Sequence, residues 1–158
     1  MKTKDSEFTY KERNENRRNE AEEAAEIFFN TKNITYRRLG FDEKSDLIEL
    51  NKFSLVPSVI RCLPDYIAIG NKAIFVEAKG FVDDLKIKED DFEEYKKWNT
   101  IMPLSIFAYD TKKKVIFYFE LEQIIDSLHL FAKDKYHDNQ KTYFRIDWEF
   151  MKQNFKTL

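Results

Sequence analysis

Two carboxylates and a lysine lie at the ends of apolar runs in the stretch LPDYIAIGNKAIFVEAKGF, residues 63–81. Asp65 stands at the start of the first run, and Glu77 and Lys79 close the second. Paired carboxylates are ligands that Mg²⁺ uses in proteins, and a neighbouring lysine can orient or deprotonate the attacking water, or neutralise developing negative charge. The types and spacing of these residues therefore predict a site for metal-assisted hydrolysis of a phosphodiester.

The length of the loop between the two runs decides whether the three charges converge. Side chains alternate along a strand, so Glu77 and Lys79 share one face. A two-residue loop would pair Asp65 with Val76 and place it on the opposite face. A three-residue loop, 70–72, pairs Asp65 directly with Glu77, and a slip of one residue reverses the face. Loops of three residues containing glycine are common in hairpins, and the predicted site requires this odd length.

Two carboxylates that face each other across a hairpin repel, and the pKa of one of them is raised. A divalent cation between them removes this conflict, because Mg²⁺ takes one or two carboxylates together with waters and substrate phosphate. The alternative is that Asp65 and Glu77 are ordinary surface charges in a chain that is 35% charged. The helix and two strands expected after them favour the functional interpretation.

Composition limits the classes of protein and of site. The 158 residues are enough for one domain, and fifteen Phe and eight Tyr predict an aromatic core. The single cysteine, Cys62, excludes an intrachain disulfide and indicates a reducing compartment, and His129 and His137 alone make a histidine-based site improbable. The chain shows neither a signal peptide nor a membrane-spanning run, so we expect a cytoplasmic protein without membrane contact or organic cofactor.

Hydrophobic periodicity predicts an α/β protein, a mixed sheet flanked by helices. The expected helices cover 13–30, 90–99, 121–132 and 148–155, and the expected strands cover 34–39, 65–69, 73–79, 104–110, 114–120 and 142–146. Residues 40–62 are ambiguous, with a short helix after Ser45 as one option. We expect a single domain, 1–158, made of a flexible arm (1–11), a catalytic core (12–120) and a C-terminal extension (121–158).

Pro64-Asp65 followed by Glu77-Ala78-Lys79 on a hairpin resembles the signature of the PD-(D/E)xK nuclease superfamily. Within it, PDYIAIGNKAIFVEAKG is similar to the phage endonuclease I group of Holliday-junction resolvases, which have a Pro-Asp-aromatic strand and an FVE-x-KG strand. The resemblance covers roughly residues 20–110. It implies a restriction-endonuclease-like fold, with an αβββαβ core and a C-terminal helical and strand extension.

The resemblance also implies roles for individual residues. Asp65 and Glu77 would bind Mg²⁺ or Mn²⁺, and Lys79 would be the catalytic lysine. The family places a further catalytic glutamate on its first helix, where it would support the metal site. Glu22 matches this residue best, with Glu20 as the alternative. The implied protein is a homodimeric, metal-dependent deoxyribonuclease acting on branched or double-stranded DNA, encoded by a phage or another mobile element.

Basic residues near the motif are candidate contacts for nucleic acid. The candidates for contact with phosphates are Arg17, Arg18, Lys86 and Lys88, with the two lysines preferred because they lie just beyond the Glu-x-Lys strand. For any one of the four, an ordinary solubilising charge is the simpler interpretation. The net charge of −2 differs from the usually basic junction resolvases and leaves the substrate open. The alternatives are a homing, repair or restriction-type endonuclease, a nuclease fold that only binds DNA or protein, and an α/β interaction module in which the motif is accidental.

Two further features have plainer interpretations. Phe92, Tyr95 and Trp98 recur at helical spacing and are expected to pack in the core rather than to stack on bases. Cys62 has no histidine close to it in the sequence, and a small buried residue is expected there.

Overall fold

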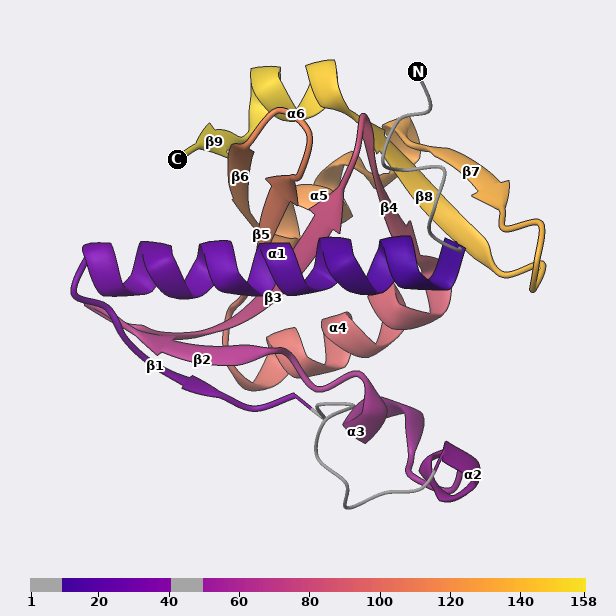
Figure 1. The fold of residues 1–158 in the computed structure, drawn as a ribbon, viewed down its shortest axis with the longest axis horizontal. Coiled ribbons are helices and arrows are strands. Elements are labelled where there is room, and N and C mark those ends of the chain that lie inside the picture. Colours follow the sequence, from indigo (N-terminus) through magenta and orange to yellow (C-terminus); the bar gives the residue numbers. More distant parts are fainter. Residues whose placement is uncertain (1–9, 41–49) are drawn as a thin grey trace.

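A six-stranded mixed sheet with helices on both faces forms the body of the protein, and a three-stranded antiparallel sheet lies beside it (Figure 1). This is a computed structural model, and it describes residues 10–40 and 50–158. The helices are α1 (Tyr10–Thr31), α2 (Leu50–Phe53), α3 (Ser58–Arg61), α4 (Glu89–Ile101), α5 (Leu121–Ser127), the 3₁₀ turn η2 (Leu128–Leu130) and α6 (Trp148–Asn154). The strands are β1 (Thr35–Arg38), β2 (Tyr66–Ile69), β3 (Ala73–Phe81), β4 (Asp84–Lys88), β5 (Leu104–Asp110), β6 (Val115–Glu120), β7 (Ala132–Lys135), β8 (Thr142–Asp147) and β9 (Lys156–Thr157).

The large sheet has the strand order β1-β2-β3-β5-β6-β9. Its one parallel pair, β3 and β5, is joined through α4, as a parallel connection requires a crossover. The hairpins β2–β3 and β5–β6 flank this unit and are antiparallel. Apart from the short helices α2 and α3 and the strand β4, which belongs to the second sheet, the order α1-β1-β2-β3-α4-β5 follows the predicted αβββαβ core. The predicted mixed sheet flanked by helices is confirmed.

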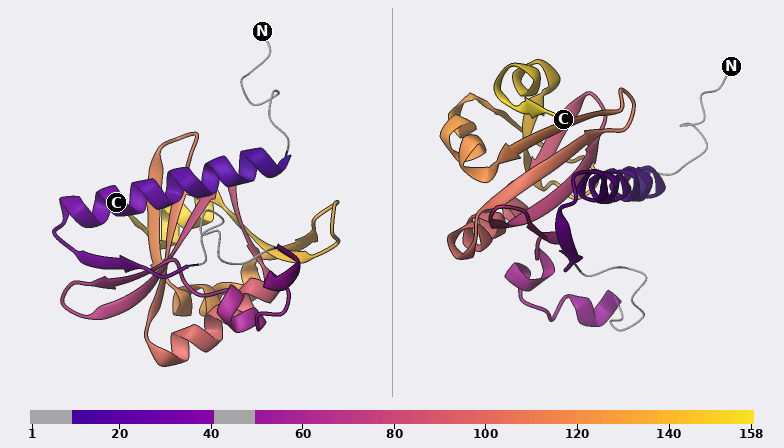
Figure 2. Two further views of the ribbon diagram at one scale, coloured as in Figure 1. Left: turned by 60° about the horizontal axis from the view of Figure 1, so that its bottom comes forward. Right: turned by 90° about the vertical axis from the view of Figure 1, so that its left-hand side faces the viewer.

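Helix α1 lies along one face of the large sheet (Figures 1 and 2). Ala21, Ala25 and Phe29 form its buried stripe and pack with Tyr66 and Val76 of the sheet. The two alanines bring the helix axis close to the strands, and the Phe29 ring lies edge-on to the Tyr66 ring at 5.5 Å between centroids. Burial of a side chain such as Phe29 contributes about 2 kcal/mol.

The opposite face of the large sheet carries the larger apolar cluster. Helices α4, α5 and α6 contribute to it, with Phe92, Ile124 and Met151 fully buried. Leu85 of β4 joins the same cluster, so β4 turns one face to the core and leaves Lys86 and Lys88 on the other. The alternation of Leu85-Lys86-Ile87-Lys88 follows the period of a half-buried strand.

The second sheet, in the order β4-β8-β7, departs from the prediction. The predicted strand 142–146 is confirmed as β8, but β4 and β7 were not predicted. The predicted helix 121–132 is wrong beyond Ser127, because η2 follows α5 and Ala132 already pairs with Arg145 in β7–β8. All four residues of β7 are exposed, so its strand conformation comes from pairing with β8 rather than from a local apolar pattern.

Some predictions fall wholly or partly outside the described residues. The arm 1–11 lies outside them, except that residues 10 and 11 belong to α1, which begins three residues before the predicted start. The possible helix after Ser45 lies partly outside them, and α2 and α3 occupy the described part of that region. None of the described helices is long and apolar enough to cross a membrane.

Candidate active site

The loop between β2 and β3 has the odd length that the site requires. Ile69 pairs with Ala73 and Tyr66 with Val76, which leaves 70–72 as a three-residue connection. One step beyond Tyr66, this register sets Asp65 against Glu77. The predicted register is therefore confirmed, and the two carboxylates approach each other across the hairpin.

Asp65 is a buried carboxylate, only 7% exposed. Its Oδ2 accepts a hydrogen bond of 2.8 Å from the Ala78 backbone N–H, which holds the side chain against β3. Burial, and then the charge of Glu77, raise the pKa of Asp65 from 3.8 to about 8. A second negative charge is thus costly here unless a proton or a cation compensates it.

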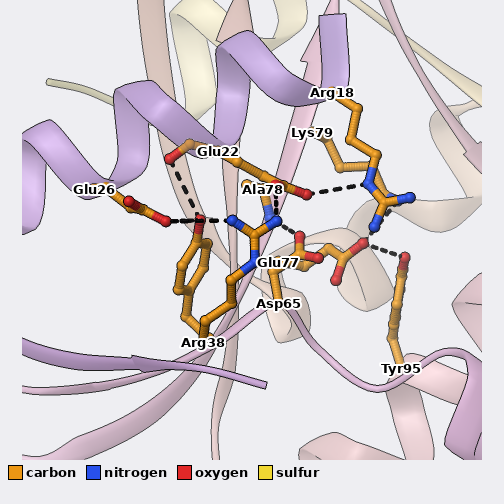
Figure 3. A network of polar contacts seen from close by, with 10 residues as sticks. Arg18, Glu22, Glu26, Arg38, Asp65, Glu77, Ala78, Lys79 and Tyr95 are labelled. Carbon is orange, nitrogen blue, oxygen red and sulfur yellow. Dashed lines mark hydrogen bonds and ion pairs between the residues drawn. The ribbon is translucent and has the colours of Figure 1, made fainter. Parts of the chain in front are cut away.

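Glu77 is 8% exposed and is held by two donors (Figure 3). Its Oε1 accepts from Lys79 Nζ at 3.0 Å and from the Tyr95 hydroxyl at 2.8 Å. Burial, followed by the charge of Glu77, raises the pKa of Tyr95 well above its ordinary value, so this hydroxyl keeps its proton and donates. The predicted burial of Tyr95 is confirmed, but its hydroxyl is a site group that the sequence analysis did not identify; the only signal was a polar aromatic among apolar ones on the α4 stripe.

Lys79 is an ammonium group in this arrangement. Burial lowers its pKa, but Tyr95 and Glu77 outweigh burial and hold the pKa of Lys79 well above its ordinary value. A protonated lysine donates hydrogen bonds and cannot accept a proton. Of the roles that the sequence left open for Lys79, orientation of a water and neutralisation of charge fit this state, and removal of a proton from the water does not.

The structure places the two candidate glutamates of α1 differently. Glu22 is 5% exposed and lies at the site, where Oε1 accepts from Arg18 Nε at 3.1 Å and Oε2 is paired with Arg38 Nη2 (Figure 3). Glu20 points to the surface and forms an ion pair with Lys114 at 3.1 Å. Glu22 is thus the helix carboxylate that the fold brings to the site.

A cleft of about 510 Å³ opens over these residues. The four basic residues singled out in the sequence, Arg17, Arg18, Lys86 and Lys88, all line it, and Arg61 lines it as well. With Lys79 these make six basic side chains around the cleft against four carboxylates, whereas the whole chain carries a net charge of −2. The lining of the cleft is therefore more basic than the chain as a whole, which favours the approach of a polyanion.

Lys86 is fixed within the cleft by aromatic rings. Its Nζ lies 5.0 Å from the centre of the Tyr143 ring and 6.0 Å from that of Tyr136, within the range of a cation–π contact. The residues that hold Lys86 belong to the second sheet and the loop between β7 and β8, which the sequence analysis left without a role.

Asp65 and Glu77 fit a hard divalent cation. Asp65 Oδ1 and Glu77 Oε2 accept no hydrogen bond from the part of the chain that the structure describes. Within 10–40 and 50–158, no group of three or more His, Cys, Asp or Glu is placed to share a metal. Two carboxylates with waters and substrate phosphate completing the shell are what Mg²⁺ ordinarily uses.

Cys62 also lines the cleft and is half-buried rather than fully buried as expected. Burial, and then Asp91 and Glu94, raise the pKa of Cys62 to about 11. The thiol therefore stays protonated near neutral pH, which argues against a thiolate nucleophile at this position.

The comparisons with known proteins give little beyond this geometry. No protein-family model matches the chain, and no curated protein matches it. Among solved structures, it is similar to a nuclease from a fusselovirus at 12% sequence identity and a TM-score of 0.49, over 96% of this chain and 89% of that chain. A likeness of this degree transfers neither residues nor activity, and function has to be argued from the site.

Proposed function

We propose that this protein is a metal-dependent nuclease that hydrolyses phosphodiester bonds of DNA. The observation that carries the proposal is the facing pair Asp65 and Glu77, both buried, with the Lys79 ammonium against Glu77 at the base of a cleft lined by basic side chains. Lys79 compensates Glu77, but no basic side chain of the described residues pairs with Asp65. A divalent ion between the two carboxylates would supply the positive charge that otherwise only a proton on Asp65 provides.

A Mg²⁺ or Mn²⁺ ion held by Asp65 and Glu77 would supply charge stabilisation and a water of lowered pKa. The protein groups do the rest. The Ala78 N–H and the Tyr95 hydroxyl keep the two carboxylates in place, since each donates to one of them. Lys79 donates from Nζ to the attacking water or to the phosphate oxygen that gains charge.

DNA fits the cleft better than a small phosphate ester does. Arg61 of α3 and Lys86 and Lys88 of β4 also line the cleft, so its basic lining comes also from elements other than those that carry the carboxylate pair. Charges spread in this way contact successive phosphates of a backbone. We further propose selectivity for branched DNA, and this narrower proposal rests on the resemblance of the hairpin to that of junction resolvases.

The test is a cleavage assay with a labelled four-way junction and a linear duplex of the same sequence, each with Mg²⁺, with Mn²⁺ and with EDTA. We expect the wild type to cut DNA only when metal is present. Glu77→Gln and Lys79→Met should abolish this cutting. Glu20→Gln, a matched change on the surface of α1, should leave it unchanged. Cutting of the junction alone would support a resolvase, and cutting of both would support a general or restriction-type nuclease.

If the protein cuts neither DNA, a binding assay is the next step. The same proteins would then be titrated with both DNAs in an anisotropy assay. Binding without cutting would replace the proposal with a nuclease fold that only binds DNA, and the absence of both would leave an interaction module with an accidental motif.

A further inference from the structure

The least expected contact at the site is the one between Glu22 and Arg18. If Glu22 were a metal ligand, an oxygen would have to face the pair Asp65 and Glu77. Instead one oxygen accepts from Arg18 and the other pairs with Arg38, and no group of three metal-binding side chains occurs in residues 10–40 and 50–158. Glu22 reaches the site from α1, which packs on the Val76 and Ala78 face of β3, whereas Glu77 contacts Tyr95 on the other face.

Arg18 is held at the carboxylate pair without being bound to it. Its hydrogen bond runs from Nε to Glu22, and among the described residues none accepts from its two Nη groups. Burial lowers the pKa of Arg18, but Asp65 and then Glu22 outweigh burial and raise it, so the guanidinium is charged and near Asp65. A planar group with four N–H donors directed into a cleft is suited to bind the oxygens of one phosphate.

The main chain next to Arg18 is fixed by a glycine. A Cβ at Gly80 would lie 2.1 Å from the Arg17 carbonyl oxygen and 2.6 Å from the Arg17 carbonyl carbon. Helix α1 therefore touches the backbone of β3 one residue after Lys79, and any side chain at this position would push the helix away. The contact sets the distance between Arg18 on the helix and Lys79 on the strand.

We propose that Arg18 forms a phosphate-binding subsite that contacts the scissile phosphodiester, and that Glu22 and Gly80 are the residues that position it. This inference rests on the proposed nuclease function and adds to it the group that binds the reacting phosphate opposite Lys79. It assigns Glu22 the role of a positioning residue, in place of direct support of a metal.

The first measurement separates phosphate binding from metal binding. Arg18→Ala, Arg18→Lys, Glu22→Gln and Asp65→Asn are compared with two controls, Glu20→Gln and Lys114→Ala, which break a surface ion pair on the same helix. Calorimetry with Mn²⁺ alone is expected to give wild-type affinity for the Arg18 and Glu22 variants and to lose binding in Asp65→Asn. Anisotropy with a fluorescein-labelled duplex in Ca²⁺ is expected to show about 10-fold to 100-fold weaker binding for Arg18→Ala.

The second measurement is kinetic. Arg18→Ala is expected to lower kcat by about 10²-fold to 10³-fold, with only partial recovery in Arg18→Lys, because an ammonium cannot reproduce the two-pronged contact. Added guanidinium ion should restore part of the rate of Arg18→Ala and none of that of Lys79→Met. Such rescue would not occur if Arg18 were needed only for folding.

Several outcomes would overturn the inference. Loss of Mn²⁺ affinity in Glu22→Gln to the extent seen in Asp65→Asn would make Glu22 a metal ligand. Duplex binding by Arg18→Ala equal to that of Lys114→Ala would remove Arg18 from the subsite. If the wild type cuts no DNA, the proposed function fails, while the Mn²⁺ and duplex titrations still decide the roles of Glu22 and Arg18.

Discussion

Asp65 and Glu77 face each other across the β2–β3 hairpin, both nearly buried, and the backbone N–H of Ala78, the residue after Glu77, donates to Asp65 Oδ2 at 2.8 Å. A strand pair that served only for stability would not place two carboxylates opposite each other. The arrangement costs stability without a cation and makes the protein responsive to one.

Without metal, the pKa of Asp65 makes stability depend on pH. The pKa is about 8 in the folded protein against an ordinary value of 3.8, so the native state binds this proton more tightly than the unfolded state does. The free energy of unfolding is therefore expected to fall as the pH rises from about 4 through about 8, by a few kcal/mol in order of magnitude, and to level off above. Urea unfolding across this range measures it. Asp65→Asn should remove most of the decline, and an equally steep decline in that variant would assign it to other groups.

Metal should stabilise the protein more at high pH than at low pH. An ion held by Asp65 and Glu77 competes with the proton on Asp65, so its apparent affinity falls as the pH drops below about 8. We expect Mn²⁺ to raise the Tm clearly at pH 8.5 and only slightly near pH 6, as ligand binding to the folded state requires. EDTA should reverse the shift. A shift of the same size in Asp65→Asn or Glu77→Gln would mean that the ion binds elsewhere.

Tyr95→Phe tests the donor that holds Glu77 from α4. The ring would stay packed, while the 2.8 Å hydrogen bond to Glu77 Oε1 is lost. We expect a stability loss of about 1.5–3 kcal/mol, as is usual for a hydrogen bond to a charged group, and a reduced kcat. Tyr118→Phe, at a half-buried tyrosine of β6 that does not line the cleft, is the control for loss of a tyrosine hydroxyl. Unchanged cleavage by Tyr95→Phe would show that Lys79 alone holds Glu77.

Gly80→Ala tests the contact between α1 and β3. The new methyl group would collide with the backbone of Arg17, which cannot rotate away as a side chain does. We expect a loss of at least about 2–3 kcal/mol in the free energy of unfolding, typical of overpacking against a fixed neighbour. Gly70→Ala is the control, because nothing lies within 4 Å of a Cβ at that position. Equal stability of the two variants in thermal unfolding would show that the helix moves without cost.

The sequence by itself determined the parts that depend on local pattern. Alternation along β3 put Glu77 and Lys79 on one face, and the three-residue loop put Asp65 opposite Glu77, because strand period and loop length are properties of neighbouring residues. The long helices α1 and α4 and the hairpin β5–β6 were predicted nearly to their ends for the same reason.

The tertiary structure decided what depends on residues far apart in the chain. Strand β7 has no apolar pattern and exists because it pairs with β8. The choice of Glu22 over Glu20 follows from which side of α1 packs on β3. Likewise, the Tyr95 hydroxyl gains its role only when α4 packs beneath Glu77. The types of side chain indicate which groups are able to interact. The packing of distant elements decides which of them do, because a contact between residues far apart in the chain has no signal in the local sequence pattern.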